Sequence, residues 1–181
     1  MTPDERLLTG PTDGRRALLF LLLLATVLFG AGLGLRDPWP ADEPRFALVA
    51  RQMVESGEWL FPVRGGELYP DKPPLFMWAI ALFLKLTGSL RVAFLLPSLL
   101  AGLGTLALVF DLARRLHDRA TAWRTGLLLL LTVQFTLQAR TAQIDGLATF
   151  FITLGVYGFL RFLLLGGGWR WYYLGWFAAG L

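Results

Sequence analysis

The chain has 181 residues, of which 55% are hydrophobic and 17% are charged. Soluble domains have ~45–50% apolar and ~25% charged residues, and a domain of this size cannot bury so much apolar surface. The composition therefore predicts a membrane protein. The absence of cysteine excludes disulfides and cysteine-based metal or redox sites. The net charge of +4 does not indicate nucleic-acid binding, because most of the excess lies beside apolar runs, where it sets membrane topology.

The first apolar run covers residues 17–35 and follows a polar stretch, residues 1–16, which we predict to be a cytosolic tail. The run has no charged residue and is long enough to cross the hydrocarbon core of a bilayer. It is longer than the apolar region of a signal peptide, and no A-x-A cleavage pattern follows it. Because Arg15 and Arg16 precede it, we predict transmembrane helix 1 with its N-terminus inside.

Residues 36–89 are rich in charged side chains and differ sharply from the flanking sequence. Two helices are predicted here, over 44–56 and 73–88, each with an apolar stripe at helical spacing. The second is short for a transmembrane helix and carries Lys85. We therefore expect both helices to lie in the membrane interface, within an extracytoplasmic loop.

Residues 90–181 are predicted to hold transmembrane helices 2–4, near 92–112, 125–137 and 147–165, and the start of a fifth at 171–181. Arginines concentrate in the connection 113–124, which the positive-inside rule places in the cytosol. Together these segments predict a single all-α membrane domain, a bundle of four to five spans. The chain ends inside an apolar run, so we expect a truncated fragment of a longer protein.

Two acidic residues, Asp42 and Glu43, follow the first span at the outer membrane surface. One interpretation is a helix N-cap with Pro44 in the first turn. The other is a catalytic carboxylate that acts on a substrate whose tail stays in the bilayer. Further along, prolines on both sides keep Lys72 out of a helix interior. Lys72 then either contacts a phosphate or snorkels to the interface paired with Asp71.

Arg140 and Asp145 lie in the predicted outer turn between spans 3 and 4. Charged residues this close to hydrocarbon are candidates for function, although Asp145 could equally cap the fourth span. An even number of crossings places Asp145 on the same side of the membrane as Asp42, Arg45 and Lys72. We predict that these four side chains converge at the outer surface.

Several motifs in this chain resemble the first outer loop of bacterial GT-C glycosyltransferases. They are Asp-Glu-Pro-Arg-Phe at 42–46, Met-Val-Glu-Ser-Gly-Glu-Trp at 53–59 and Tyr-Pro-Asp-Lys-Pro-Pro-Leu at 69–75, and Ala-Arg-Thr-Ala at 139–142 continues the pattern. The resemblance is to glycosyltransferase family 39, the branch of the protein O-mannosyltransferases and the lipid A aminoarabinose transferases. It covers residues 17–165.

This resemblance implies a multi-span, GT-C-type helical bundle in the inner (plasma) membrane, with its active face outside the cytoplasm. It implies a glycosyltransferase of the cell envelope that moves a sugar from a polyprenyl-phosphate donor to a lipid or protein acceptor. A single displacement would invert the anomeric carbon. Matching positions make Asp42 and Asp145 catalytic and make Asp71 the candidate ligand of a divalent metal ion. The implied substrate-binding residues are Glu43, Arg45, Tyr69, Lys72 and Arg140.

The sequence departs from close relatives before the second catalytic position, where Gln143-Ile144-Asp145 replaces their usual Arg-Pro-Asp. Two alternatives to an active transferase remain. The chain could be a transporter or channel subunit in which Asp42, Arg140 and Asp145 relay charge, although these residues are placed at helix ends rather than at mid-membrane depth. It could also be an inactive truncated fragment. Nucleic acid is not an expected partner.

Overall fold

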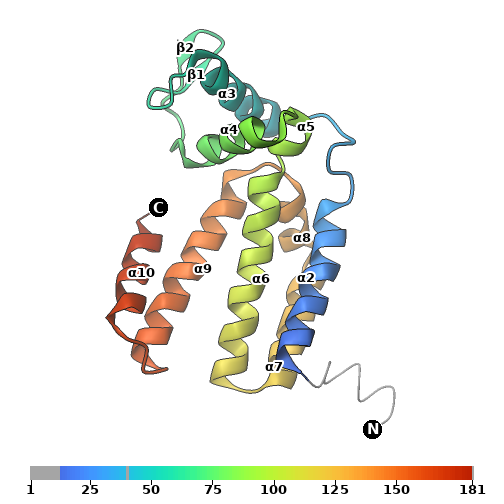
Figure 1. The fold of residues 1–181 in the computed structure, drawn as a ribbon, viewed down its shortest axis with the longest axis vertical. Helices are drawn as coiled ribbons and strands as arrows, with labels where there is room; N and C mark the ends of the chain where they lie inside the picture. Colours follow the sequence, from blue (N-terminus) through green and yellow to red (C-terminus); the bar gives the residue numbers. More distant parts are fainter. Residues whose placement is uncertain (1–12, 40, 181) are drawn as a thin grey trace.

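The computed structural model describes residues 13–39 and 41–180. Long helices form a bundle, and a smaller unit built from residues 42–93 lies across one end of it (Figure 1). The short connection between Ser89 and Leu96 joins the two parts. This arrangement places the charged segment of the sequence at one end of the apolar helices.

Helix α2 spans Gly14–Gly30, so it begins before the predicted boundary at residue 17 and ends before residue 35. The side chain of Asp13 caps the helix by accepting a hydrogen bond of 3.0 Å from the backbone N–H of Arg15, which extends the helix into the predicted tail. Gly32 and Gly34 have φ values of +91° and +76°, and this left-handed backbone ends the helix early. The rest of the predicted tail, residues 1–12, lies outside the described residues.

Three further helices of the bundle, α6, α9 and α10, correspond to predicted elements. Helix α6 covers Leu96–Leu116 after the short α5 at Leu90–Ala93, α9 covers Ile144–Leu163, and α10 covers Trp169–Ala179. Among the described residues, two helical stretches are long and apolar enough to cross a membrane, Leu90–Leu116 and Ile144–Leu163. The count of four to five spans therefore remains a prediction.

The predicted third span, 125–137, is not one continuous helix. Helix α7 runs over Arg119–Leu131 and α8 over Val133–Arg140, with a break at Thr132, where ψ is 108°. The hydroxyl of Thr132 donates a hydrogen bond of 2.9 Å to the Leu128 carbonyl. A side chain that bonds the preceding turn offers the backbone an alternative to helix continuation, and a β-branched residue tolerates the extended conformation.

The smaller unit contains α3 at Asp42–Ser56 and α4 at Leu75–Thr87, close to the two helices predicted for this segment. Between them lies a hairpin of two short strands, β1 at Val63–Arg64 and β2 at Glu67–Leu68, paired antiparallel. The all-α prediction missed this hairpin. Its turn is Gly65-Gly66, with φ values of +63° and +94°, the conformation that a two-residue hairpin loop requires.

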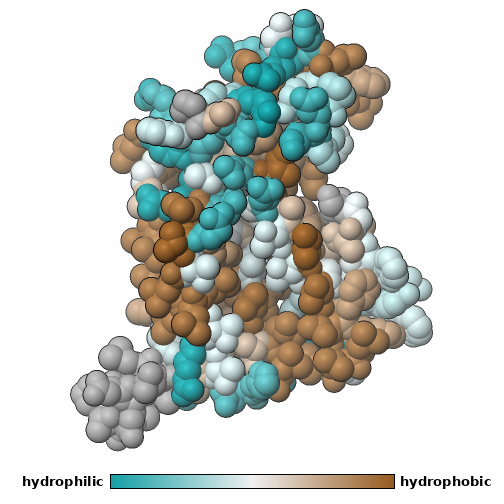
Figure 2. Space-filling view, turned by 180° about the vertical axis from the view of Figure 1, so that it is seen from behind, coloured by the Kyte–Doolittle hydropathy of each residue, from teal (hydrophilic) through white to brown (hydrophobic). Residues whose placement is uncertain are grey.

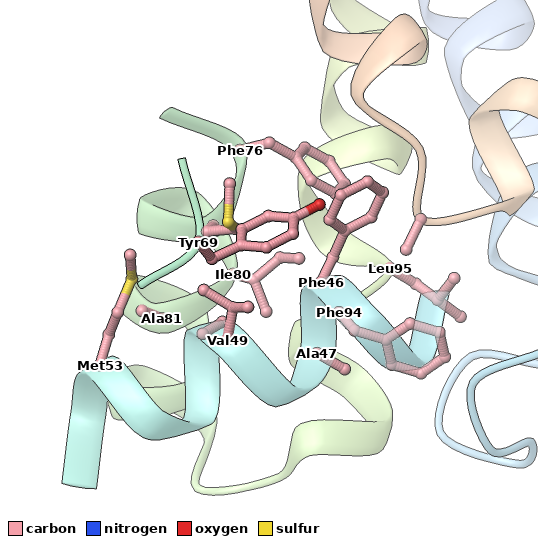
Figure 3. Close-up of a cluster of buried hydrophobic side chains, with 13 residues drawn as sticks. Phe46, Ala47, Val49, Met53, Tyr69, Phe76, Ile80, Ala81, Phe94 and Leu95 are labelled. Carbon is pink, nitrogen blue, oxygen red and sulfur yellow. The ribbon is translucent and has the colours of Figure 1, made fainter. Parts of the chain in front are cut away.

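Helices α3 and α4 bury their apolar stripes against each other (Figure 3). The rings of Phe46 and Phe76 meet edge to face, with centroids 5.5 Å apart. The stripe predicted on α3 is buried at Phe46, Val49, Ala50 and Met53. The apolar stripes of α3 and α4 therefore form a small shared core and do not face lipid separately.

The face shown in Figure 2 has a hydrophobic band over the bundle, with hydrophilic residues above it on the smaller unit and a narrower hydrophilic zone below. On the bundle helices, several large apolar side chains are more than half exposed, among them Leu19, Leu23, Val27, Leu128, Leu131 and Ile152. An apolar belt between two polar ends matches the cross-section of a bilayer.

Candidate active site

A small pocket of about 60 Å³ lies where the N-terminus of α3 meets the turn between α8 and α9. Four charged side chains line it, two carboxylates and two cations, which come from three separate parts of the sequence. The charged lining residues are Asp42, Arg45, Lys72 and Asp145, joined by Phe46, Gln143 and Ile144. The structure thus brings together the four side chains that the sequence placed on one side of the membrane.

Asp42 is the first residue of α3, since the N-cap position is Ala41. The N-cap interpretation of Asp42 is therefore wrong, although a carboxylate in the first turn still interacts favourably with the helix dipole. Its Oδ1 accepts a short hydrogen bond from the Arg45 guanidinium one turn later. The side chain of Asp42 is 46% exposed, so a molecule in the pocket can reach it.

The guanidinium of Arg45 lies over two aromatic rings, those of Phe46 at 5.1 Å and Tyr69 at 5.9 Å. Its Nε is buried and has no hydrogen-bond partner among the described residues. Ring contacts of this kind hold a cation in place without neutralising it. Arg45 is therefore fixed at the pocket wall, where its guanidinium is paired with Asp42.

Tyr69 lies in the core of the smaller unit and is 4% exposed. Figure 3 shows its hydroxyl directed toward Phe46 and Phe76, and this oxygen has no hydrogen-bond partner in the described part of the chain. Tyr69 does not line the pocket with Asp42. Tyr69 contacts the site through its ring, over which the guanidinium of Arg45 lies.

Lys72 is exposed and reaches two neighbouring hollows. One is the charged pocket, and the other is a groove of about 440 Å³ whose walls are mostly proline and apolar side chains. In the described residues no ion pair joins Lys72 to Asp71, so the snorkelling pair considered above does not form. The lysine ammonium remains available to an anion.

Asp145 is the second residue of α9, whose N-cap is Gln143. The N-cap interpretation of Asp145 is therefore also wrong. Its side chain is exposed and lines the pocket. Two carboxylates and two cations that line one pocket can accept a proton and neutralise a phosphate in one place.

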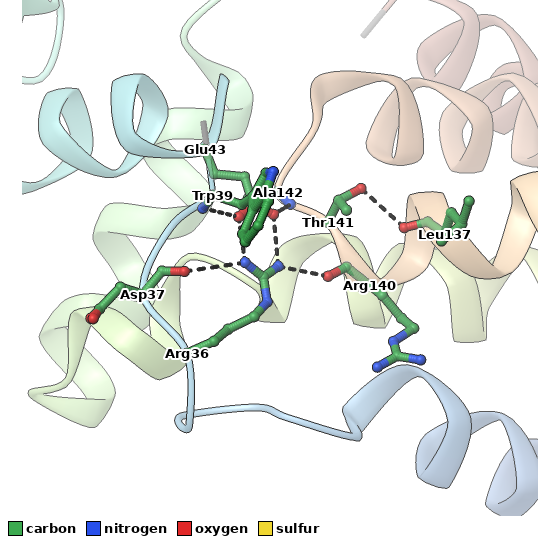
Figure 4. Close-up of polar contacts among 8 residues, drawn as sticks. All are labelled: Arg36, Asp37, Trp39, Glu43, Leu137, Arg140, Thr141 and Ala142. Atoms are coloured by element: carbon green, nitrogen blue, oxygen red, sulfur yellow. Dashed lines mark hydrogen bonds and ion pairs between the residues drawn. The ribbon is translucent and has the colours of Figure 1, made fainter. Parts of the chain in front are cut away.

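Glu43 is placed differently from its neighbour Asp42, because its side chain is only 4% exposed and does not line the pocket. Its Oε1 accepts hydrogen bonds of 2.8 Å from both the Arg36 guanidinium and the Ala142 backbone N–H, and Oε2 accepts one of 2.7 Å from the Trp39 backbone N–H (Figure 4). Arg36 also bonds Oε2, which makes the pair bidentate.

These contacts decide the ionisation of Glu43. Burial by itself would raise the pKa of Glu43, but the hydrogen bonds from Arg36, Trp39 and Ala142 and the charge of Arg36 outweigh it, and the pKa lies below its ordinary value. The hydrogen bond to Glu43 in turn raises the pKa of Arg36 against the effect of burial. Glu43 is thus a charged carboxylate whose acceptor sites are used by the protein itself.

Arg140 lies outside the pocket, at the end of α8. Its guanidinium donates to the Ala31 carbonyl at 3.1 Å, and its own carbonyl accepts from Arg36 at 3.0 Å. The sequence analysis did not single out Arg36. Arg36 follows the first apolar run, and a charge beside hydrocarbon is a sign of a functional or structural role. However, the segment between Arg36 and Glu43 is irregular, so no helical or strand spacing predicts that the two side chains meet.

Asp71 is exposed in the proline-lined groove, and residues 13–39 and 41–180 contain no group of three or more His, Asp or Glu side chains that could hold a metal ion. A single carboxylate holds a divalent cation only together with other ligands, such as water and substrate phosphate. A metal-binding role for Asp71 therefore stays a prediction. No step of the chemistry proposed below uses a metal ion.

The sequence model of dolichyl-phosphate-mannose-protein mannosyltransferases matches residues 71–181, more than half of the chain. The chain belongs to this family. This match confirms the resemblance to the family 39 branch of the GT-C glycosyltransferases.

Two curated relatives are named undecaprenyl phosphate-alpha-4-amino-4-deoxy-L-arabinose arabinosyl transferase. The one from Shewanella sediminis is 31% identical over 72% of the chain and 24% of its own length. The one from Pseudomonas aeruginosa is 32% identical over 92% of the chain and 31% of its own length. A protein from Aquifex aeolicus without an assigned function is 35% identical over 77% of the chain and 28% of its own length.

The fold is similar to part of ArnT from Cupriavidus metallidurans, whose crystal structure bound to undecaprenyl phosphate superposes with a TM-score of 0.82 at 24% identity. The match covers 89% of the chain and 30% of ArnT. The multi-span membrane fold expected from the motifs is therefore the fold observed. The chain spans about a third of the length of these relatives or less.

Proposed function

We propose that this chain carries part of the active site of a membrane glycosyltransferase that uses an undecaprenyl-phosphate-linked sugar as donor. The observation that supports it most directly is the pocket in which Asp42, Arg45, Lys72 and Asp145 meet. The named relatives act on such donors, and the family match covers Lys72 and Asp145. We place the protein in the inner membrane, with the pocket on the outer face.

The two cations serve the leaving group. Transfer breaks the bond between the anomeric carbon and the phosphate oxygen, and the polyprenyl phosphate leaves with the electron pair. Lys72 and Arg45 stabilise the charge that develops on this phosphate. Because a phosphate is already a stable anion, the leaving group needs no protonation.

The two carboxylates serve the acceptor and the sugar. Asp42 takes the proton of an acceptor hydroxyl as its oxygen bonds to the anomeric carbon, and a phosphate acceptor would need Asp42 only for orientation. Asp145, which lines the same pocket, stabilises positive charge that develops at the sugar ring. A single displacement predicts inversion. Arg140 and Tyr69 stabilise the substrate site indirectly. Arg140 bonds the end of α2, and the Tyr69 ring contacts the guanidinium of Arg45.

The test uses the full-length protein with an undecaprenyl-phosphate-linked aminoarabinose donor and a lipid A acceptor. Asp42→Asn should lower kcat by about 100-fold or more, the usual effect of losing a general base, while undecaprenyl phosphate still binds. Lys72→Ala should weaken that binding and lower kcat/KM together. Glu67→Gln, in the exposed hairpin, is the control and should behave as wild type. Turnover of folded Asp42→Asn near the wild-type rate would refute the catalytic role.

A further inference from the structure

The two proposed catalytic carboxylates come from segments about a hundred residues apart, and only a few contacts fix how these segments meet. Asp42 begins α3, while Asp145 follows the α8–α9 turn. Within residues 13–39 and 41–180, the Asp42 carboxylate bonds only within its own helix, to Arg45. The spacing of the two carboxylates must therefore be set by a neighbouring contact.

That contact is centred on Glu43. Its carboxylate accepts from the Ala142 backbone N–H at 2.8 Å, a contact that joins α3 to the α8–α9 turn. Ala142 is fully buried, at 0% exposure. Glu43 is adjacent to Asp42, and Ala142 is three residues before Asp145, so at ~3.8 Å per residue the joint lies within about 12 Å of chain from each carboxylate.

Arg36 completes the joint from a third segment. Its guanidinium is bidentate to Glu43 and also donates to the Arg140 carbonyl at 3.0 Å, on the same turn as Ala142 (Figure 4). Arg36 stacks on the Phe94 ring at 5.2 Å as well. One guanidinium thus bonds α3 and the end of α8 at once, and its planar fork makes this geometry rigid.

We infer that Arg36 and Glu43 are positioning residues, which set the separation of Asp42 and Asp145 by joining α3 to the α8–α9 turn. This inference rests on the proposed function for its kinetic consequence. Neither side chain lines the pocket, so neither touches the donor. Loss of the joint should therefore lower the rate of the chemical step more than it lowers donor affinity, because misplaced groups affect the transition state first.

The structural arm of the test needs no substrate. In the full-length protein freed of other cysteines, spin labels at Leu48→Cys on α3 and Ala148→Cys on α9, both exposed positions, report the distance between the two elements. We expect one narrow distance distribution in the wild-type background. Glu43→Gln and Arg36→Gln should each broaden or shift it, and Arg36→Lys, which keeps the charge but loses the fork, should lie between.

The kinetic arm compares the same variants in turnover and in binding of undecaprenyl phosphate. Glu43→Gln should lower kcat by roughly 10- to 100-fold with KM for the donor changed less than about two-fold. The matched control is Asp37→Asn, which breaks an exposed ion pair with Arg91 in the same connection and should leave kcat and the distances unchanged.

The outcomes separate the two ideas. If Glu43→Gln and Arg36→Gln keep both a narrow distance distribution and wild-type kcat, the positioning inference is wrong, whatever Asp42→Asn does. If the distances broaden but Asp42→Asn remains active, the joint stands and the proposed function fails. If Glu43→Gln does not fold, Arg36→Lys decides the question. A distance distribution and a kcat between those of wild type and Arg36→Gln support the inference, whereas wild-type values of both overturn it.

Discussion

At the scale of single residues, the adjacent carboxylates Asp42 and Glu43 have opposite surroundings. Asp42 is open to the pocket, whereas Glu43 is enclosed by Arg36 and two backbone donors. In a helix, consecutive residues point about 100° apart, so one acidic pair can serve both a site and the structure around it. The sequence resemblance implied a catalytic role for Asp42 and a substrate-binding role for Glu43.

The lowered pKa of Glu43 predicts how stability depends on pH. A folded-state pKa below the unfolded value of about 4.3 means that the stabilising contribution is complete above that pH and is lost as the pH falls through the folded value. In the full-length protein, Glu43→Gln should lower Tm clearly at pH 7, because it removes the charge that pairs with Arg36. The cost should lie below the ~3–5 kcal/mol of a fully buried pair, since the Arg36 side chain is 33% exposed. The difference in Tm should shrink as the pH falls below about 4.

Thermal unfolding of both proteins from pH 7 to pH 3 measures this difference. Glu55→Gln is the control, since its ion pair with Arg51 is exposed on both sides and should contribute little at any pH. A Tm difference for Glu43→Gln that stays constant over the whole range would show that the charge of Glu43 is not what stabilises the joint.

At the scale of elements, α9 and α10 approach so closely that glycine is required at their contact. A Cβ added at Gly158 would lie 2.7 Å from the Trp171 carbonyl oxygen and 2.8 Å from the Gly175 nitrogen, both backbone atoms. Small residues permit such approaches between membrane helices. The contact holds the short, aromatic α10 in place even though few apolar residues of α9 are buried.

Gly158→Ala should therefore push α10 away from α9. We expect a loss of ~1–3 kcal/mol, the usual cost of overpacking, even though alanine favours the helix by up to about 1 kcal/mol. The matched variant is Gly30→Ala at the end of α2, where the new Cβ would meet only the Leu99 side chain at 3.7 Å. Thermal unfolding and protease cleavage in residues 164–168 measure the effect, and equal stability of the two variants would contradict the close contact.

At the scale of the whole molecule, the pocket and the arginine-rich connection lie at opposite ends of the bundle. Figure 1 shows α3, α4 and the hairpin beyond one end, and the link between α6 and α7 at the other. His117 and Asp118 form that link, next to Arg114, Arg115 and Arg119. Arginines beside a span indicate the cytosolic side, which supports the outer face for the pocket.

This topology can be tested with single cysteines, because these 181 residues contain none. Arg64→Cys in the hairpin and His117→Cys, both exposed positions, should differ in intact cells, in the full-length protein freed of other cysteines. An impermeant thiol reagent should label Arg64→Cys at once and His117→Cys only after the membrane is permeabilised. Labelling of His117→Cys in intact cells would show that the protein has the opposite orientation in the membrane.

The sequence by itself determined the apolar helices, the two helices of the smaller unit and the four charged residues of the pocket. Hydropathy and helical periodicity are local properties, and crossing parity is sufficient to assign Asp42, Lys72 and Asp145 to one side. The structure also revealed the break at Thr132 and the hairpin at Gly65-Gly66, whose causes are local. The partners of Glu43 are different, because its carboxylate accepts from the Ala142 backbone N–H about a hundred residues further along the chain. Burial strengthens this hydrogen bond, and no spacing along the chain predicts it.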